Sequence, residues 1–225
     1  MKELLIDPMI FINRSAKSPA ITLATILILF CASVFAQQKG NFTDPRDGKT
    51  YKTAKIGEQT WMAENLNYDA EGSICYRNNP IYCSKYGRLY NWETAKKICP
   101  EGWHLPNNAE WDKLFRFADG NTGTESPYQS ETAGNHLKAA RGWDSYGKSD
   151  GNGTDKYGFS ALPGGYGEGS SFYHVGSFGY WWSASEYEVY SDRAYRRYMN
   201  YKYGYIYWSY NDYKSNLLSV RCVQN

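Results

Sequence analysis

The sequence is poor in the residue types on which most enzymes and nucleic-acid-binding proteins rely. Its only histidines are His104, His136 and His174, and none stands at a recognised catalytic spacing from a nucleophile or a carboxylate. Lys and Arg together number 25 and Asp and Glu 23, so the net charge of +2 offers no basic surface to a nucleic acid. The composition therefore predicts neither a catalytic centre nor a nucleic-acid partner.

Long apolar runs are confined to the N-terminal part of the sequence. Residues 20–35 carry no charge, follow a basic segment and lead into Val34-Phe35-Ala36, which places small residues where a signal peptidase cuts. We predict a signal peptide over residues 1–36 and an exported protein. An uncleaved membrane anchor and a lipid anchor at Cys31 are the alternatives, and they would be the chain's only contact with a membrane.

Four cysteines remain after residue 36: Cys75, Cys83, Cys99 and Cys222. An even number of cysteines in an exported chain predicts disulfides, for which three pairings are open. Metal binding by four thiolates is the less favoured alternative, because the spacing contains no Cys-x-x-Cys.

The pattern along the chain predicts a single domain over residues 42–225, after a short segment at residues 37–41. Residues 50–66 have the pattern of a hairpin, and helical patterns follow at residues 92–98 and from Asn107 or Asn108 to Gly120. The predicted later strands are residues 171–175, 180–185, 194–200, 205–209 and 217–223. Short helices early and irregular antiparallel strands late predict an α+β fold.

Five motifs occur in order along the chain: IGEQTWMAENL (56–66), KICPEGWHLPNNAEW (97–111), GFSALPGG (158–165), YWWSAS (180–185) and SVRCV (219–223). In this order they resemble the Fibrobacter succinogenes major paralogous domain family, over about residues 42–224. The resemblance implies a bacterial protein that is secreted or held at the outer cell surface. It implies no particular activity, because members of the family largely lack an assigned one.

Residues 105–111 also resemble the Leu-Pro-Thr-x-Ala-Glu-Trp element of the formylglycine-generating sulfatase-modifying enzymes, which have a C-type-lectin-like fold. This more distant resemblance implies the same architecture, stabilised by a disulfide between an early helix and the last strand. It favours the pairing Cys99–Cys222 together with Cys75–Cys83, which closes a short loop. The enzymatic activity is not carried over, because it needs two cysteines near the C-terminus and Cys222 is alone there.

Aromatic residues are what the sequence has in excess, with 22 Tyr, 8 Trp and 9 Phe. Many follow residue 157, interspersed with Arg, Lys, Asn and Ser, and Tyr takes every second position over residues 201–207, as on one face of a strand. Exposed rings beside hydrogen-bonding groups are suited to sugars, whereas packing within a sheet is the alternative. The predicted ligand-binding residues are Trp181, Trp182, Tyr203, Tyr205, Tyr207, Trp208 and Tyr210.

A second candidate site is a calcium loop. Asp150, Asn152 and Asp155 place oxygen-bearing side chains between glycines, as calcium-binding loops do. Ala161 stands where such a loop has its bidentate glutamate, and the alternative is a turn held by its own side-chain to backbone bonds. No other cofactor is predicted.

Together these features predict a non-catalytic binding module for polysaccharide or another glycan. One alternative is a structural or adhesion protein that binds protein partners through the Tyr-rich face. Another is an enzyme of unknown type.

Overall fold

The computed structural model describes residues 38–120, 129–130 and 132–225, and all of them fall within one compact unit. The predicted signal peptide and Cys31 lie outside these residues. None of the helices in the described part of the chain is both long and apolar enough to cross a membrane.

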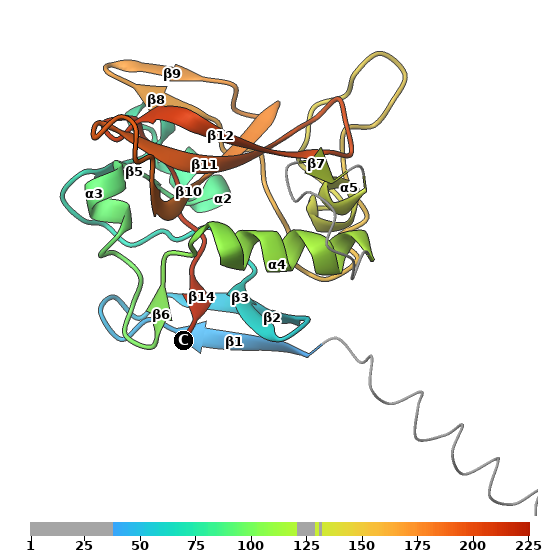
Figure 1. Cartoon of the computed structure of the whole chain (residues 1–225), viewed down its shortest axis with the longest axis horizontal. Helices are drawn as coiled ribbons and strands as arrows, with labels where there is room; N and C mark the ends of the chain where they lie inside the picture. The colour runs from blue at the N-terminus through green and yellow to red at the C-terminus, as the bar shows by residue number, and fades with distance from the viewer. Residues whose placement is uncertain (1–37, 121–128, 131) are drawn as a thin grey trace, which may run out of the picture. The chain divides into compact units, whose positions relative to one another are not determined.

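The first sheet is built around the predicted hairpin. Its order is β1-β2-β3-β14-β6, with neighbours antiparallel (Figure 1). The strands are β1 (Lys39–Thr43), β2 (Thr50–Ile56), β3 (Gln59–Met62), β14 (Val223–Gln224) and β6 (Trp103–His104). The turn between β2 and β3 passes through Gly57 at φ 61°, a conformation that favours glycine. The hairpin predicted over residues 50–66 is confirmed.

The second sheet has the order β4-β5-β13-β10-β11-β12-β7. Its strands are β4 (Ser73–Ile74), β5 (Leu89–Tyr90), β13 (Leu218–Ser219), β10 (Phe178–Glu186), β11 (Arg193–Asn200), β12 (Ile206–Tyr213) and β7 (Gln129–Ser130). Neighbouring strands are antiparallel, except that β10 and β13 run parallel. A separate hairpin, β8 (Tyr166–Glu168) and β9 (Ser171–Tyr173), completes a mixed α+β fold. The predicted class is confirmed, but strands occur early as well as late in the described part of the chain, because β1, β2, β3 and β6 form most of the first sheet.

Helix α4 (Asn108–Asp119) lies between the two sheets (Figure 1). Its first turn is closed by a capping box, in which the Asn107 side chain accepts from the Glu110 N–H and the Glu110 carboxylate accepts from the Asn107 N–H. Gly120 ends the helix in the left-handed conformation. Both ends of the predicted helix are therefore confirmed.

The other helices are η1 (Tyr76–Asn78), α2 (Pro80–Tyr86), α3 (Trp92–Ala95) and α5 (Ala133–Leu137). Helix α3 is shorter than the predicted residues 92–98. The chain tightens after Ala95, where the Lys97 N–H bonds to the Thr94 carbonyl three residues back, and Pro100 follows. The short helix thus gives way to a turn before Cys99.

Two disulfides join the elements, Cys75–Cys83 and Cys99–Cys222. The first spans 8 residues around η1 and α2, and the second spans 123 residues, from the segment after α3 to the residue before β14. Both predicted pairings are confirmed.

Trp181 and Trp182 point to opposite faces of β10 and into two different core clusters. Each is fully buried, and each indole N–H has a buried acceptor: Asn65 Oδ1 at 2.9 Å for Trp181 and the Tyr90 carbonyl at 2.8 Å for Trp182. A ligand cannot stack on rings that the core encloses. The ligand-binding role predicted for this pair is therefore corrected to a structural one.

A buried cation lies at the centre of the molecule. The Arg221 side chain is fully buried and donates to Asn65 Oδ1 from Nε at 3.2 Å and from Nη2 at 2.8 Å. It also donates to the Met62 carbonyl at 3.1 Å and to the carbonyls of Phe159 and Ser160. Burial lowers the pKa of Arg221. No carboxylate in the described part of the chain is bonded to it, so these neutral acceptors stabilise the buried guanidinium.

Candidate functional site

The Tyr-rich segment does not form the strand that its alternation predicts. Strand β11 ends at Asn200 and β12 begins at Ile206, so residues 201–205 form the turn between them. The Asn200 side-chain oxygen accepts from the backbone N–H groups of Lys202 and Tyr203, both at 2.9 Å, and so closes the turn. Most of the segment in which Tyr alternates with other residues is therefore a turn, and its alternation does not reflect strand pairing.

Tertiary structure nevertheless brings these tyrosines together with two others. Tyr180, Tyr198, Tyr207, Tyr205 and Tyr203 form a continuous series, which we term the tyrosine strip. Successive ring centroids lie 5.7, 4.9, 5.9 and 5.6 Å apart. The strip crosses β10, β11 and β12 through directly paired residues and then continues into the turn.

Exposure increases along the tyrosine strip. Tyr180 is 5% exposed, Tyr198, Tyr207 and Tyr205 are half-buried, and Tyr203 at the turn is 42% exposed. Desolvation by burial raises the pKa of Tyr180, Tyr198 and Tyr207. Burial therefore favours the phenol form at these three positions, and a phenol hydroxyl can both donate and accept hydrogen bonds.

An ion pair lies beside the buried end of the strip. The Arg196 guanidinium is 4.6 Å from the Tyr180 ring centroid and 5.5 Å from that of Tyr198. Its Nη1 donates to Asp212 Oδ1 at 2.7 Å, and the Asn216 amide donates to the same oxygen at 3.5 Å. Although Arg196 opposes it, desolvation raises the pKa of the buried Asp212 carboxyl. The pair adds polar groups to an otherwise aromatic surface.

A buried lysine anchors the exposed end. Lys138 is 3% exposed, and its Nζ donates to the carbonyls of Gly151 at 2.8 Å, Tyr203 at 3.2 Å and Asn200 at 3.3 Å. Burial lowers the pKa of Lys138 to about 8. The three carbonyls belong to the Tyr-bearing turn and to the loop beside it, so this single cation fixes their relative position.

Helix α5 comes close to the same turn at Gly134. A Cβ at this position would lie 2.6 Å from the Gly204 carbonyl oxygen and 2.7 Å from that of Tyr205. Only glycine permits this approach without displacing the turn. The backbone under the exposed tyrosines is thus held from two sides.

Of the remaining predicted ligand-binding residues, Trp208 is on the other face of the sheet. It pairs with Arg197 in the strand register, whereas its neighbour Tyr207 pairs with Tyr198. Its ring is half-buried and lies 6.0 Å from that of Tyr195. The Tyr210 side chain is outside the described part of the structure. Of the predicted set, Tyr203, Tyr205 and Tyr207 lie in the tyrosine strip.

The predicted calcium ligands are engaged with the protein itself. Asp150 accepts from the backbone and side-chain amides of Asn152, and the Asn152 oxygen accepts from the Trp143 N–H at 2.9 Å. Both Asp155 oxygens accept from Ser160. Within the described ranges no three His, Cys, Asp or Glu side chains are grouped so as to hold a metal ion. These contacts are those of a turn held by its own side-chain bonds, which is the alternative to a calcium loop.

One His–carboxylate contact has the composition of an acid–base pair. His104 Nε2 lies 2.6 Å from Glu110 Oε1, and His104 Nδ1 lies 2.6 Å from Asn225 Oδ1. The other Glu110 oxygen closes the capping box of α4. The Nε2 contact joins β6 to α4, the Nδ1 contact joins β6 to the residue after β14, and the second Glu110 oxygen belongs to the helix cap. Both ring nitrogens and both carboxylate oxygens thus have partners within the protein, as in a structural contact.

Tyr180 and Tyr198 are the members of the strip that sequence reasoning missed. Each lies in a predicted strand, but membership depends on Tyr180 standing opposite Tyr198 and Tyr198 opposite Tyr207. Strand register between separate segments is not visible in one sequence. The signal in the sequence is an aromatic residue in each of the two predicted strands, which favours cross-strand aromatic pairs.

Comparison with known proteins gives one result. The family model described as Fibrobacter succinogenes major domain matches residues 54–224, which include all five sequence motifs. No curated protein and no solved structure matches the chain.

Proposed function

The chain belongs to the Fibrobacter succinogenes major domain family, and from this premise we propose that it is an exported, non-catalytic module that binds polysaccharide or another glycan. The observation that carries the proposal is the tyrosine strip. Its rings supply apolar contact area, and its hydroxyls supply hydrogen bonds to sugar hydroxyls.

The exposed end of the strip has the geometry that such binding requires. The Tyr203 and Tyr205 rings are inclined by only 23°, with centroids 5.6 Å apart, so they form an offset platform. Lys202 lies beside it, with its ammonium 5.0 Å from the Tyr203 ring centroid and 4.6 Å from that of Tyr146. Aromatic area flanked by hydrogen-bonding groups favours a hydroxylated ligand over an apolar protein surface.

Rigidity of the turn also supports binding. Lys138 and the close packing of α5 at Gly134 fix the backbone that carries Tyr203 and Tyr205. A ligand therefore meets rings that are already in place, which reduces the entropic cost of association.

Export and architecture are parts of the same proposal. Two disulfides are typical of proteins from oxidising compartments. The Cys99–Cys222 bridge, in a mixed α+β domain, is the feature expected of a C-type-lectin-like fold. We include that architecture as the fold through which the strip is displayed.

The test is a pull-down with insoluble polysaccharides together with a soluble glycan array. We expect the Tyr203→Ala/Tyr205→Ala variant to lose retention, because removal of both rings removes the platform. Tyr190→Ala is the matched control, since Tyr190 is 57% exposed and is not part of the strip. Far-ultraviolet circular dichroism would establish that both variants are folded.

Absence of binding to any glycan would overturn the proposal and leave adhesion to protein as the interpretation of this face. Equal loss in the strip variant and in the control would show that retention depends on general surface properties and not on the strip.

A further inference from the structure

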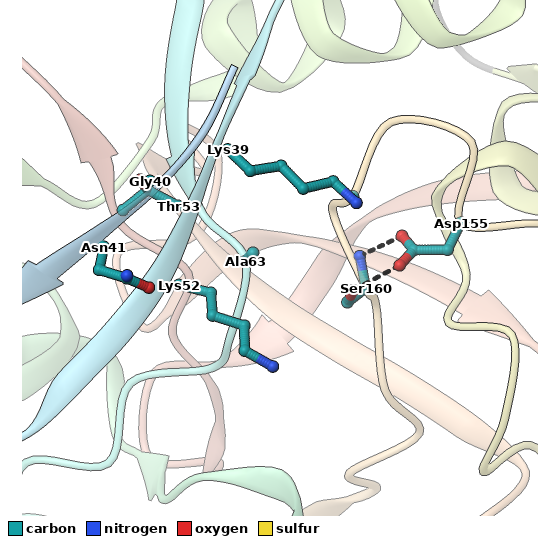
Figure 2. Close-up of a pocket in the computed structure, with 9 residues that line it drawn as sticks. Lys39, Gly40, Asn41, Lys52, Thr53, Ala63, Asp155 and Ser160 are labelled. Atoms are coloured by element: carbon teal, nitrogen blue, oxygen red, sulfur yellow. Dashed lines mark hydrogen bonds between the residues drawn. The ribbon is translucent and has the colours of Figure 1, made fainter. Parts of the chain in front are cut away.

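A polar pocket lies away from the tyrosine strip, where the first sheet meets the loop over residues 155–160. Its volume is about 380 Å³, within the range of small-molecule sites. Strands β1 and β2 contribute one wall and this loop the other (Figure 2). No residue of the pocket belongs to the tyrosine strip.

One wall is cationic. Lys39 of β1 and Lys52 of β2 extend across the opening toward the opposite loop (Figure 2). Both side chains are exposed, and among the residues that the structure describes neither ammonium has an ion-pair or hydrogen-bond partner. Two ammoniums that line one pocket and have no ion-pair partner among the described residues are both available to a single anion.

The other wall carries a fixed acidic group. Asp155 Oδ1 accepts from the Ser160 N–H at 2.7 Å, and Oδ2 accepts from the Ser160 hydroxyl at 2.6 Å (Figure 2). Both residues have left-handed backbones, with φ of 47° for Asp155 and 52° for Ser160. A non-glycine residue adopts this conformation at a cost, and such strain is concentrated at functional sites.

The buried Arg221 supports this wall from behind. Its guanidinium donates to the carbonyls of Phe159 and Ser160, and the Asp155 N–H donates to the Lys138 carbonyl at 3.1 Å. The carboxylate and hydroxyl are therefore held in position, while the lysine side chains opposite them are free to move. Each Asp155 oxygen accepts one hydrogen bond from Ser160 and has a further lone pair with which to accept from a ligand.

We infer that this pocket binds an acidic sugar unit. The carboxylate of a uronate would lie between the Lys39 and Lys52 ammoniums, and its ring hydroxyls would donate to Asp155 and bond with Ser160. Two ammoniums against one carboxylate leave the pocket with an excess of positive charge, which selects an anionic ligand over a neutral one. The inference does not depend on the tyrosine strip.

The test is titration of the full mature chain with D-glucuronate, followed by ¹H–¹⁵N correlation spectra. We expect shifts of the Gly158 and Ser160 amides and an affinity that falls with added salt. D-Glucose, which lacks the carboxylate, and sodium acetate, which lacks the hydroxyls, should each bind about tenfold more weakly or worse, because each loses at least one charge-assisted hydrogen bond.

Lys39→Gln/Lys52→Gln is the test variant, and Lys55→Gln is its matched control on the same strand, outside the pocket. Both change only exposed side chains, so both should fold. The double variant should lose glucuronate binding, whereas the control and the Tyr203→Ala/Tyr205→Ala variant should keep it. The inference would be overturned if the native chain did not bind glucuronate, or if it bound glucose or acetate as tightly as glucuronate. Unchanged binding by the double variant would overturn it as well.

Discussion

Replacement of Asn65 by leucine should destabilise the protein more than most single substitutions do. Asn65 is 5% exposed, and its side-chain oxygen accepts from Arg221 Nε and Nη2 and from the Trp181 indole N–H. Its amide donates to the Tyr86 carbonyl at 2.8 Å. Leucine has a similar volume, so the substitution removes hydrogen bonds without opening a large cavity.

The magnitude follows from which groups lose partners. The Trp181 N–H would be left unsatisfied at a cost of about 1–3 kcal/mol. The two Arg221 bonds share one acceptor oxygen and are counted as one charged interaction, whose loss adds about 1.5–3 kcal/mol. We therefore expect the free energy of unfolding to fall by about 4 kcal/mol, or about 8–16 °C in Tm for a domain of this size. Asn65→Asp loses the bond to the Tyr86 carbonyl, because a carboxylate cannot donate. It should still cost less than leucine, because the carboxylate accepts from both Arg221 and Trp181 and neutralises the buried cation.

Urea denaturation under non-reducing conditions, followed by tryptophan fluorescence, measures these differences. Asn67→Leu is the control: Asn67 is half-buried, its side chain makes no hydrogen bond within the described residues, and its substitution should change stability by less than about 0.5 kcal/mol. A loss below 1 kcal/mol for Asn65→Leu, or a greater loss for Asn65→Asp than for Asn65→Leu, would refute the reasoning about Arg221.

Two further predictions concern the disulfides and the buried lysine. Replacing Cys99 and Cys222 by alanine should lower the free energy of unfolding by about 5 kcal/mol, and replacing Cys75 and Cys83 should lower it by about 2.5 kcal/mol. The difference arises because the closed segments span 123 and 8 residues. Equal shifts of the urea midpoint for the two double variants would contradict this. For Lys138, burial lowers the pKa from 10.5 to about 8, so between these pH values the unfolded chain binds a proton that the folded chain has released, and stability rises with pH. Between pH 8 and 10.5 the free energy of unfolding of the native chain should therefore rise by up to about 3 kcal/mol relative to that of Lys138→Met. If the unfolding free energies of the two proteins changed in parallel with pH, the pKa of Lys138 would not be lowered.

Local rules predict the elements whose hydrogen bonds close within a few residues. The α4 boundaries follow from Asn107, Glu110 and Gly120, since a capping box and a left-handed glycine need no distant partner. The β2–β3 hairpin likewise depends on adjacent segments and the turn at Gly57. The bonds of the Asn200 side chain to Lys202 and Tyr203 are equally local, and they form a turn where the alternation of Tyr predicts a strand.

The candidate site could be predicted only in part. The sequence indicates that tyrosines gather late in the chain, and Tyr203, Tyr205 and Tyr207 do lie in one series. It does not indicate that both Trp181 and Trp182 are buried. Alternation along a strand places one of them on each face, and only the tertiary structure shows that both faces of β10 are covered. Exposure of a side chain depends on the layers that pack against it.

By itself, the sequence determined the family, the α+β class and the ends of α4, because motifs, composition and helix caps are properties of short segments. With the fold resemblance, it also indicated both disulfides. Only the tertiary structure decided that Asn65 meets Arg221, that five tyrosines form one strip, and that Lys39 and Lys52 face Asp155. These contacts join residues far apart in the chain, and strand register and layer packing bring them together.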